Sequence, residues 1–261
     1  MTFVDIATAA RIEQAEARAL AGIPAATTHA LPEGIAVFVR PGSPFNKLLG
    51  GGITAPFAHA QLVAAERLFR DRGERLRIEL CSLAAPATYE QLANRDYRFI
   101  AVEHVLVRRL GARPAAASAF TIERANAAEF RATFLGAAIH EDGTGVVADA
   151  FTEATTAAAI DDARGAPGFV DYVAYEGGTP VGAATMHVAG DIAVLMGSGT
   201  VPAHRGRGVQ RALLEHRLSD AYDAGARLAV VTTGTGTRSQ ANVMKVGFAL
   251  AYARSILVAT V

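Results

Sequence analysis

The chain has 261 residues, of which 51% are hydrophobic and 19% charged, a composition typical of a folded protein with one large or two modest domains. Its 25 basic and 25 acidic residues balance, which excludes the excess of positive charge that marks nucleic-acid binders. No apolar run approaches the roughly 18 residues that span a membrane, and the N-terminus lacks a signal-peptide pattern, so we expect a cytoplasmic protein with neither a membrane nor a nucleic-acid partner.

The first 112 residues are predicted to form an α/β unit. It starts with an amphipathic helix over 1–21, in which Ile12, Ala15 and Leu20 fall near one stripe. The further elements expected here are a strand at 34–40, a helix at 58–72, a strand at 75–83, a short helix at 89–94 and a long strand at 98–110. Residues 113–119 are small, contain Pro114 and lack periodicity, so they are predicted to be a linker.

Residues 120–261 are predicted to form a second α/β unit around three antiparallel strands, because short glycine-containing turns separate consecutive apolar runs. The elements expected here are a strand at 120–124, helices at 126–139 and 146–160, strands at 169–176, 180–188 and 192–201, a helix ending near 224, a strand at 227–233, a short helix at 240–246 and a last strand at 248–258. The predicted fold class is therefore α/β with a mixed, largely antiparallel sheet.

The two units share an order of elements. In each, a helix ends at a glycine, Gly73 or Gly225, and is followed by a strand, a short helix and a long strand. This order is consistent with a degenerate internal repeat, although helix–glycine–strand is common in unrelated proteins.

The clearest chemical signal lies between a strand that ends at Val201 and the helix that follows. Pro202 interrupts the ladder, and Gly206 and Gly208 let the backbone turn so that several N–H groups face one hollow. The positive end of the helix dipole and neighbouring arginines add to an anion site suited to phosphate. The alternative is a structural strand-to-helix turn. A dinucleotide fingerprint fits poorly, because position 211 is Arg rather than a third glycine.

The run Arg-Gly-Arg-Gly-Val-Gln at 205–210 resembles the Arg/Gln-x-x-Gly-x-Gly/Ala signature of GNAT acetyltransferases, which hold the pyrophosphate of coenzyme A on backbone amides. Residues 239–248 resemble the closing part of that family, an asparagine followed by a helix that ends in Gly-Phe. The resemblance implies a GNAT fold with two GNAT-like halves, of which the second holds acetyl-CoA. The implied ligand-binding residues are Gly199, Thr200, Val201, Arg205, Gly206, Arg207, Gly208, Val209, Gln210 and Asn242, with Thr232 and Thr233 on the far wall.

Three positions depart from the family pattern. Gln210 stands where Gly or Ala is usual, the strand at 194–196 carries no glutamate to act as base, and Val243 replaces the tyrosine that usually serves as acid. Tyr252, on the last strand, is a candidate catalytic acid if its hydroxyl reaches the cleft; otherwise it is a sheet residue with a polar tip. His187, and His140 with Glu141, are further candidates. The alternative for each is an exposed residue of a hairpin or loop without a role in the reaction.

Two other features are interpreted as structural. Cys81 is the only cysteine and falls in an apolar pattern, so it is expected in the core, with no disulfide and no metal site. The glycines at 50–52 precede a helix as a phosphate loop would, but no arginine accompanies them, and a turn is favoured. We hypothesise that the N-terminal half shapes the acceptor pocket or an interface.

The sequence therefore predicts transfer of an acetyl group from acetyl-CoA to the primary amine of a small molecule. Neither an acidic nor a basic stripe points to a macromolecular acceptor. The alternative is an acyl-CoA-binding sensor or regulatory module without turnover. A homodimer is possible.

Overall fold

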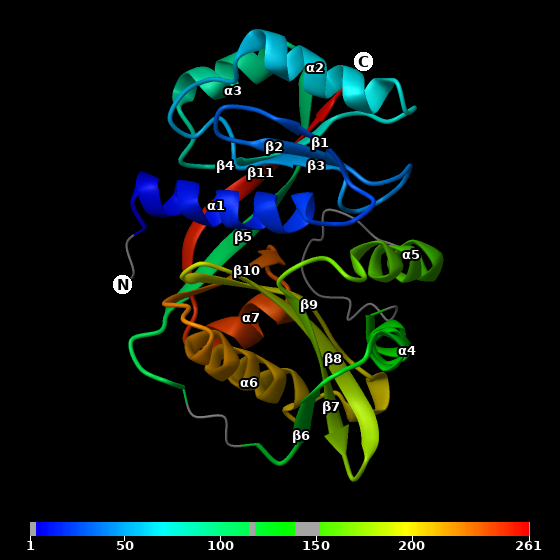
Figure 1. Cartoon of the computed structure of the whole chain (residues 1–261). Coiled ribbons are helices and arrows are strands. Elements are labelled where there is room, and N and C mark those ends of the chain that lie inside the picture. Colours follow the sequence, from blue (N-terminus) through cyan, green and yellow to red (C-terminus); the bar gives the residue numbers. More distant parts are fainter. Residues whose placement is uncertain (1–3, 115–117, 139–151, 261) are drawn as a thin grey trace.

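The computed structural model describes residues 4–114, 118–138 and 152–260 (Figure 1). The elements of the first half are α1 (Ile6–Ala21), β1 (Thr27–Ala30), β2 (Ile35–Phe38), β3 (Lys47–Leu49), α2 (His59–Arg70), β4 (Arg77–Cys81), α3 (Pro86–Ala93) and β5 (Tyr97–Arg109). Those of the second half are β6 (Thr121–Arg124), α4 (Ala127–Ala138), α5 (Glu153–Ala163), β7 (Phe169–Glu176), β8 (Thr179–Ala189), β9 (Ile192–Thr200), the 3-10 turn η1 (Pro202–His204), α6 (Val209–Asp223), β10 (Leu228–Gly234), α7 (Arg238–Lys245) and β11 (Ala249–Ala259).

All these strands join one sheet in the order β1-β2-β3-β4-β11-β5-β10-β9-β8-β7-β6. Within the described residues, β3 pairs with β4 and β9 with β10 in parallel, and all other neighbours are antiparallel. The predicted mixed, largely antiparallel sheet is confirmed.

The two halves exchange their last strands at the centre of this sheet. β5 comes from the first half, yet it lies between β10 and β11 of the second. β11 in turn reaches β4 of the first half, where Ile256 stands opposite Glu79. Figure 1 shows β5 and β11 running together through the middle of the molecule. The proposed division at residues 113–119 therefore follows a strand that is built into the other half.

The repeated order of elements is present in three dimensions. In the first half β3, α2, β4, α3 and β5 follow one another, and in the second β9, α6, β10, α7 and β11 do so. Gly73 (φ +72°) and Gly225 (φ +94°) both take the left-handed conformation after the first helix of each series. Glycines of the 50–52 loop, by contrast, are packed closely: an added Cβ at Gly51 would lie 2.5 Å from Phe57, so the loop is a turn without an open anion site.

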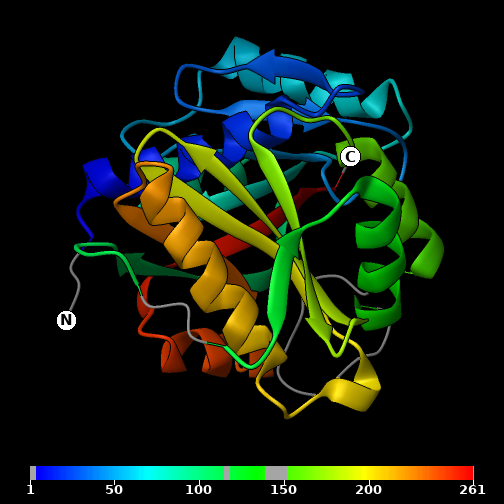
Figure 2. The same cartoon turned by 60° about the horizontal axis from the view of Figure 1, so that its bottom comes forward.

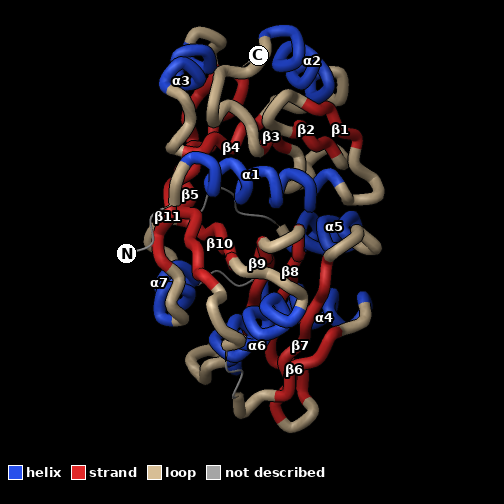
Figure 3. Tube along the Cα trace, turned by 60° about the vertical axis from the view of Figure 1, so that its left-hand side comes forward, coloured by secondary structure: helices blue, strands red, loops and turns tan. Residues whose placement is uncertain are grey.

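Side chains alternate between two helical layers along the central strands. On β8, Ala183 packs with Phe130 of α4, while its neighbour Ala184 packs with Leu213 of α6. Figure 2 shows α6 and the pair α4 and α5 on opposite sides of the strands. α1 crosses the molecule on the α4 side, between the two halves (Figure 3).

A buried ionic cluster joins α1 to the exchanged strand β11 and to β4 and β3 of the first half. Arg254 of β11 is fully buried and contacts Glu13 at 2.8 Å, Glu16 at 2.7 Å and Glu79 at 3.4 Å. Lys47 contacts the other oxygen of Glu79 at 2.6 Å. Because these charges come from four separate elements, the cluster specifies how the halves meet.

Most predicted elements are present, with shifted ends. The strands β1 and β3 were missed because each spans only three or four residues, too few to show an alternating pattern. The predicted helix at 146–160 is seen as α5 from Glu153, and its first part lies outside the described residues. None of the described helices is long and apolar enough to cross a membrane.

Candidate functional site

A V-shaped opening forms where β9 and β10 separate. Their parallel pairing covers only the register from Leu228 opposite Ile192 to Val230 opposite Val194, although both strands continue. β9 stays paired with β8 up to Thr200 and bulges at Gly197, whose φ is +33°. The edge of β9 beyond Val194 therefore faces the opening without a partner strand on the β10 side.

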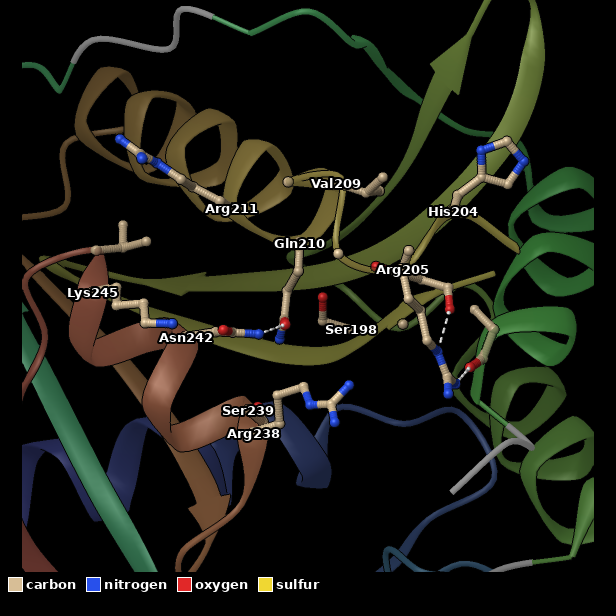
Figure 4. Close-up of a pocket in the computed structure, with 16 residues that line it drawn as sticks. Ser198, His204, Arg205, Val209, Gln210, Arg211, Arg238, Ser239, Asn242 and Lys245 are labelled. Atoms are coloured by element: carbon tan, nitrogen blue, oxygen red, sulfur yellow. Dashed lines mark hydrogen bonds between the residues drawn. The ribbon is translucent and has the colours of Figure 1, made fainter. Parts of the chain in front are cut away.

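A cavity of about 530 Å³ occupies this opening between the first turn of α6 and α7 (Figure 4). Its described lining consists of small, polar and basic residues: Ala137, Ser198, Gly199, Thr200, His204, Arg205, Gly206, Gly208, Val209, Gln210, Arg211, Arg238, Ser239, Asn242, Lys245 and Val246. None of these is acidic. The cavity thus suits a ligand that carries negative charge.

At one end of the cavity, backbone amide groups form a hollow. Gly206 (φ +77°) and Gly208 (φ +92°) both adopt the left-handed conformation, and neither has an atom within 4 Å of the place where a Cβ would stand. Ala212 donates the first hydrogen bond of α6 to the carbonyl of Gly208. The N–H groups of residues 209–211 precede that bond and lack an intrahelical acceptor, which leaves them and the helix dipole to a bound anion.

The two arginines of the signature point in different directions. Arg205 lines the cavity and donates to the carbonyls of Thr200, at 3.3 Å, and Ala137, at 3.4 Å, so it ties β9 to α4. Arg207 lies outside the lining and pairs with Glu176 at 2.5 Å, on the strand β7. The side chain of Arg207 therefore braces the loop, and a role of residue 207 in ligand binding stays a prediction.

Val201 also lies outside the described lining. Its N–H donates to the carbonyl of Val181 at 3.0 Å, which continues the β8–β9 ladder. Thr232 and Thr233, expected on the far wall, do not line the cavity either. The predicted residues that the structure brings together are Gly199, Thr200, Arg205, Gly206, Gly208, Val209, Gln210 and Asn242.

Gln210 and Asn242 meet across the cavity. The side-chain amide of Asn242 donates to the side-chain oxygen of Gln210 at 2.5 Å and joins α7 to α6 (Figure 4). The long side chain at position 210 is thereby held sideways, toward α7.

Sequence reasoning missed the basic residues of α7. Arg238, Asn242 and Lys245 are spaced four and three residues apart, so they fall on one face of this helix. That spacing around the expected Asn242 was the signal that could have found them. Arg238, Lys245 and Arg211 of α6 line the cavity with positive charge.

A buried arginine, also missed, supports the bulge from the α6 side. Arg217 is 1% exposed and donates to the carbonyls of Thr185 at 2.8 Å, Met196 at 3.2 Å and Leu213 at 3.1 Å. Burial lowers its pKa to about 9, which still leaves it charged at neutral pH. Arg217 satisfies carbonyls that the bulge withdraws from the strand ladder.

The candidate catalytic residues do not converge on this cavity. Tyr252 is buried under α1 and donates its hydroxyl to Glu13 at 2.7 Å, so the expectation that it reaches the cleft is wrong. Burial and Glu13 raise its pKa well above the usual value. His187 is buried against Phe169, and burial lowers its pKa. His140 and Glu141 lie outside the described residues. The described residues also contain no cluster of metal-ligating side chains.

Comparison with known proteins gives a family for part of the chain. Residues 134–248 match the family model described as "Acetyltransferase (GNAT) family". A search of curated proteins finds no match.

The solved structures most useful for comparison share the fold over most of the chain. The structure titled "GCN5-related N-acetyltransferase from Kribbella flavida" has a TM-score of 0.70 and 18% identity, covering 97% of this chain and 96% of that one. A GCN5-related N-acetyltransferase from Sphaerobacter thermophilus has a TM-score of 0.57 and 14% identity, over 87% of this chain and 80% of that one. A tandem GNAT protein from the clavulanic acid biosynthesis pathway has a TM-score of 0.57 and 13% identity, over 90% and 83%. The expected GNAT fold with two GNAT-like halves is confirmed.

Proposed function

We propose that this chain, which has the GNAT fold and carries a GNAT acetyltransferase family domain at residues 134–248, transfers an acetyl group from acetyl-CoA to a primary amine of a small molecule. The observation that carries the proposal is the hollow of free amides at residues 206–211, which opens into a cavity rich in positive charge. Acetyl-CoA offers phosphates for that hollow and a thioester as the acyl donor.

The cavity matches the two chemical parts of this cosubstrate. The hollow and the basic residues Arg238 and Lys245 suit the phosphates. The unpaired edge of β9 at Ser198–Thr200 suits the amide groups of the pantetheine arm, which can bind there as an added strand would. The dimensions support the same reading, since about 530 Å³ is a normal size for a cofactor site.

The reaction needs few specialised groups. A substrate ammonium loses a proton to water, and the free amine nitrogen forms a bond to the acetyl carbon. The C–S bond breaks, the nitrogen gives up its second proton to leave the amide, and the thiolate of coenzyme A takes up a proton. No carboxylate or tyrosine among the described residues lines the cavity. We therefore assign the rate enhancement chiefly to proximity and orientation of amine and thioester, with water carrying protons.

Calorimetric titration with acetyl-CoA tests the site, using the variant Gly208→Glu. A glutamate at φ +92° fills the hollow with negative charge, and we expect binding to weaken by more than 100-fold. Gly225→Glu is the matched control, because Gly225 has φ +94°, has equally open surroundings and caps the far end of α6. Equal affinity in the two variants would place the cosubstrate elsewhere.

A second candidate is an acyl-CoA-binding module without turnover. It is favoured by the absence of a carboxylate or tyrosine from the described lining of the cavity and by the buried position of Tyr252. Release of free thiol from acetyl-CoA in the presence of an amine panel separates the two. Tight binding with no amine-dependent release would support the module and exclude the enzyme.

A further inference from the structure

A second cavity, of about 400 Å³, lies on the α4 and α5 side of the sheet. Aromatic rings from three parts of the chain form its walls: Phe45 from the loop before β3, Phe130 and Phe134 from α4, and Phe169 at the start of β7. Phe130 and Phe134 stack with ring centroids 5.4 Å apart. Such a lining holds flat or compact apolar groups rather than extended polar ones.

One carboxylate stands in this apolar cavity. Asp171 of β7 is half-buried and accepts a 2.7 Å hydrogen bond from the hydroxyl of Thr185 on β8. Burial raises the pKa of Asp171, with Thr185 opposing the shift. The other charged residue of the described lining, Arg164, pairs with Asp161 at 3.0 Å. Among the described residues, Asp171 thus has no cationic partner, and its charge suits a cation supplied by a ligand.

The two cavities meet at the bulge of β9. Met196 and Gly197 line the second cavity, and the next residues, Ser198 and Gly199, line the first. Asp171, Thr185 and Met196 stand opposite one another on adjacent strands, so they form a row on one face that leads to the bulge. A ligand nitrogen near this row lies next to the place where β9 enters the acetyl-CoA cavity.

The first half of the chain contributes a fixed wall. Phe45 is followed by Asn46, whose side chain accepts from Val39 N–H at 2.8 Å and donates to the carbonyl of Arg40 at 2.7 Å. Arg40 also pairs with Asp162 of α5 at 2.8 Å. The loop of Phe45 is therefore held to α5, which also lines the cavity, so this wall is preorganised.

We propose that the second cavity is the acceptor site and that it takes a primary amine bearing one aromatic ring or a similarly compact apolar group, with its ammonium paired to Asp171. This inference rests on the proposed function. A single carboxylate among four phenyl rings matches one ammonium beside one apolar body. A polyamine would instead bury several ammonium groups that have no carboxylate partner, which is unfavourable.

Binding to the protein without acetyl-CoA tests the site independently of turnover. 2-Phenylethylamine and its neutral counterpart 2-phenylethanol are titrated by calorimetry or ligand-observed NMR. We expect Asp171→Asn to weaken the amine at least tenfold and to leave the alcohol unchanged, since asparagine still accepts from Thr185. Phe45→Ala should weaken both ligands severalfold. Glu153→Gln, which removes an exposed carboxylate of α5 outside the cavity, should change neither.

The outcomes separate this inference from the proposed function. Asp171-dependent binding of 2-phenylethylamine supports the acceptor site whether or not acetyl-CoA binds. Failure of acetyl-CoA to bind would overturn the proposed function but not the acceptor site. Conversely, bound acetyl-CoA with putrescine or a peptide N-terminus preferred over 2-phenylethylamine overturns the acceptor class and leaves the acetyltransferase standing. Equal binding of the amine by wild type and Asp171→Asn, with Phe45→Ala also unchanged, overturns the site itself.

Discussion

The side chain of Asn242 on α7 donates a 2.5 Å hydrogen bond to that of Gln210 on α6, so a bridge crosses the cavity. If acetyl-CoA displaces this bridge on entry, its binding opposes a hydrogen bond worth about 1 kcal/mol. We therefore expect Gln210→Ala to tighten acetyl-CoA binding about fivefold in calorimetric titration.

Asn242→Ala shows which partner contacts the ligand. If Asn242 serves only the bridge, its removal tightens binding to the same extent; if it also holds the cosubstrate, binding weakens. Weaker binding by Gln210→Ala would contradict the prediction and would mean that Gln210 itself contacts acetyl-CoA.

Removing Arg217 should destabilise the fold at the bulge of β9. In Arg217→Met the buried carbonyls of Thr185 and Met196 lose their donor, and we expect the free energy of unfolding to fall by about 2–4 kcal/mol. Urea unfolding measures this loss. Arg211→Met, on the same helix but paired only at the surface with Glu215, should change stability by less than about 1 kcal/mol. Equal losses in the two variants would show that Arg217 has no special role.

Tyr252→Phe should leave acetyl transfer intact. The hydroxyl is bonded to Glu13 under α1 and lies away from the cavity, so kcat should stay within about twofold while stability falls by about 1–2 kcal/mol. Steady-state kinetics and thermal unfolding on one preparation give both values. A large drop in kcat at unchanged stability would restore Tyr252 as a catalytic residue.

Acid should weaken the junction of the two halves through Glu79. Burial alone would raise the pKa of this carboxyl, but Lys47, Arg254 and Arg77 outweigh burial and lower it to about 2. Because the folded pKa lies below the usual 4.5, the stabilisation is fully present above pH 4.5 and is lost as the pH falls toward 2.

The variant Glu79→Gln isolates this contribution. It should be less stable than wild type near pH 6, by on the order of 3 kcal/mol, and the gap should close as the pH falls from 4.5 to about 2. Denaturant unfolding at several pH values measures the gap. A constant difference across that range would assign the acid sensitivity to other groups.

The sequence predicted the elements and the anion hollow because both depend on local chemistry. Gly206, Gly208 and the start of α6 are consecutive, so their conformations follow from residue type. Arg207 shows the limit of such reasoning. Its direction is decided by Glu176, a residue 31 positions earlier that no local pattern connects with it.

Tyr252 and the exchanged strands could not be predicted for the same reason. The environment of Tyr252 depends on Glu13, which lies 239 residues earlier. Packing between the halves decides whether β11 lies beside β10 or beside β5 in the sheet. Both arrangements satisfy the same alternating pattern of side chains. The second cavity likewise joins Phe45 to Asp171, which are distant in sequence.

The exchange of β5 and β11 also constrains how the protein is made. β11 lies between β4 and β5 in the sheet, yet the ribosome adds its residues well after those of both neighbours. Until they emerge, β4 and β5 each lack a hydrogen-bonded neighbour, and the carboxylates of Glu13 and Glu79 lack Arg254. The nascent N-terminal half therefore keeps two open strand edges until β11 has been synthesised, and a chain that stops before residue 249 would be prone to aggregation.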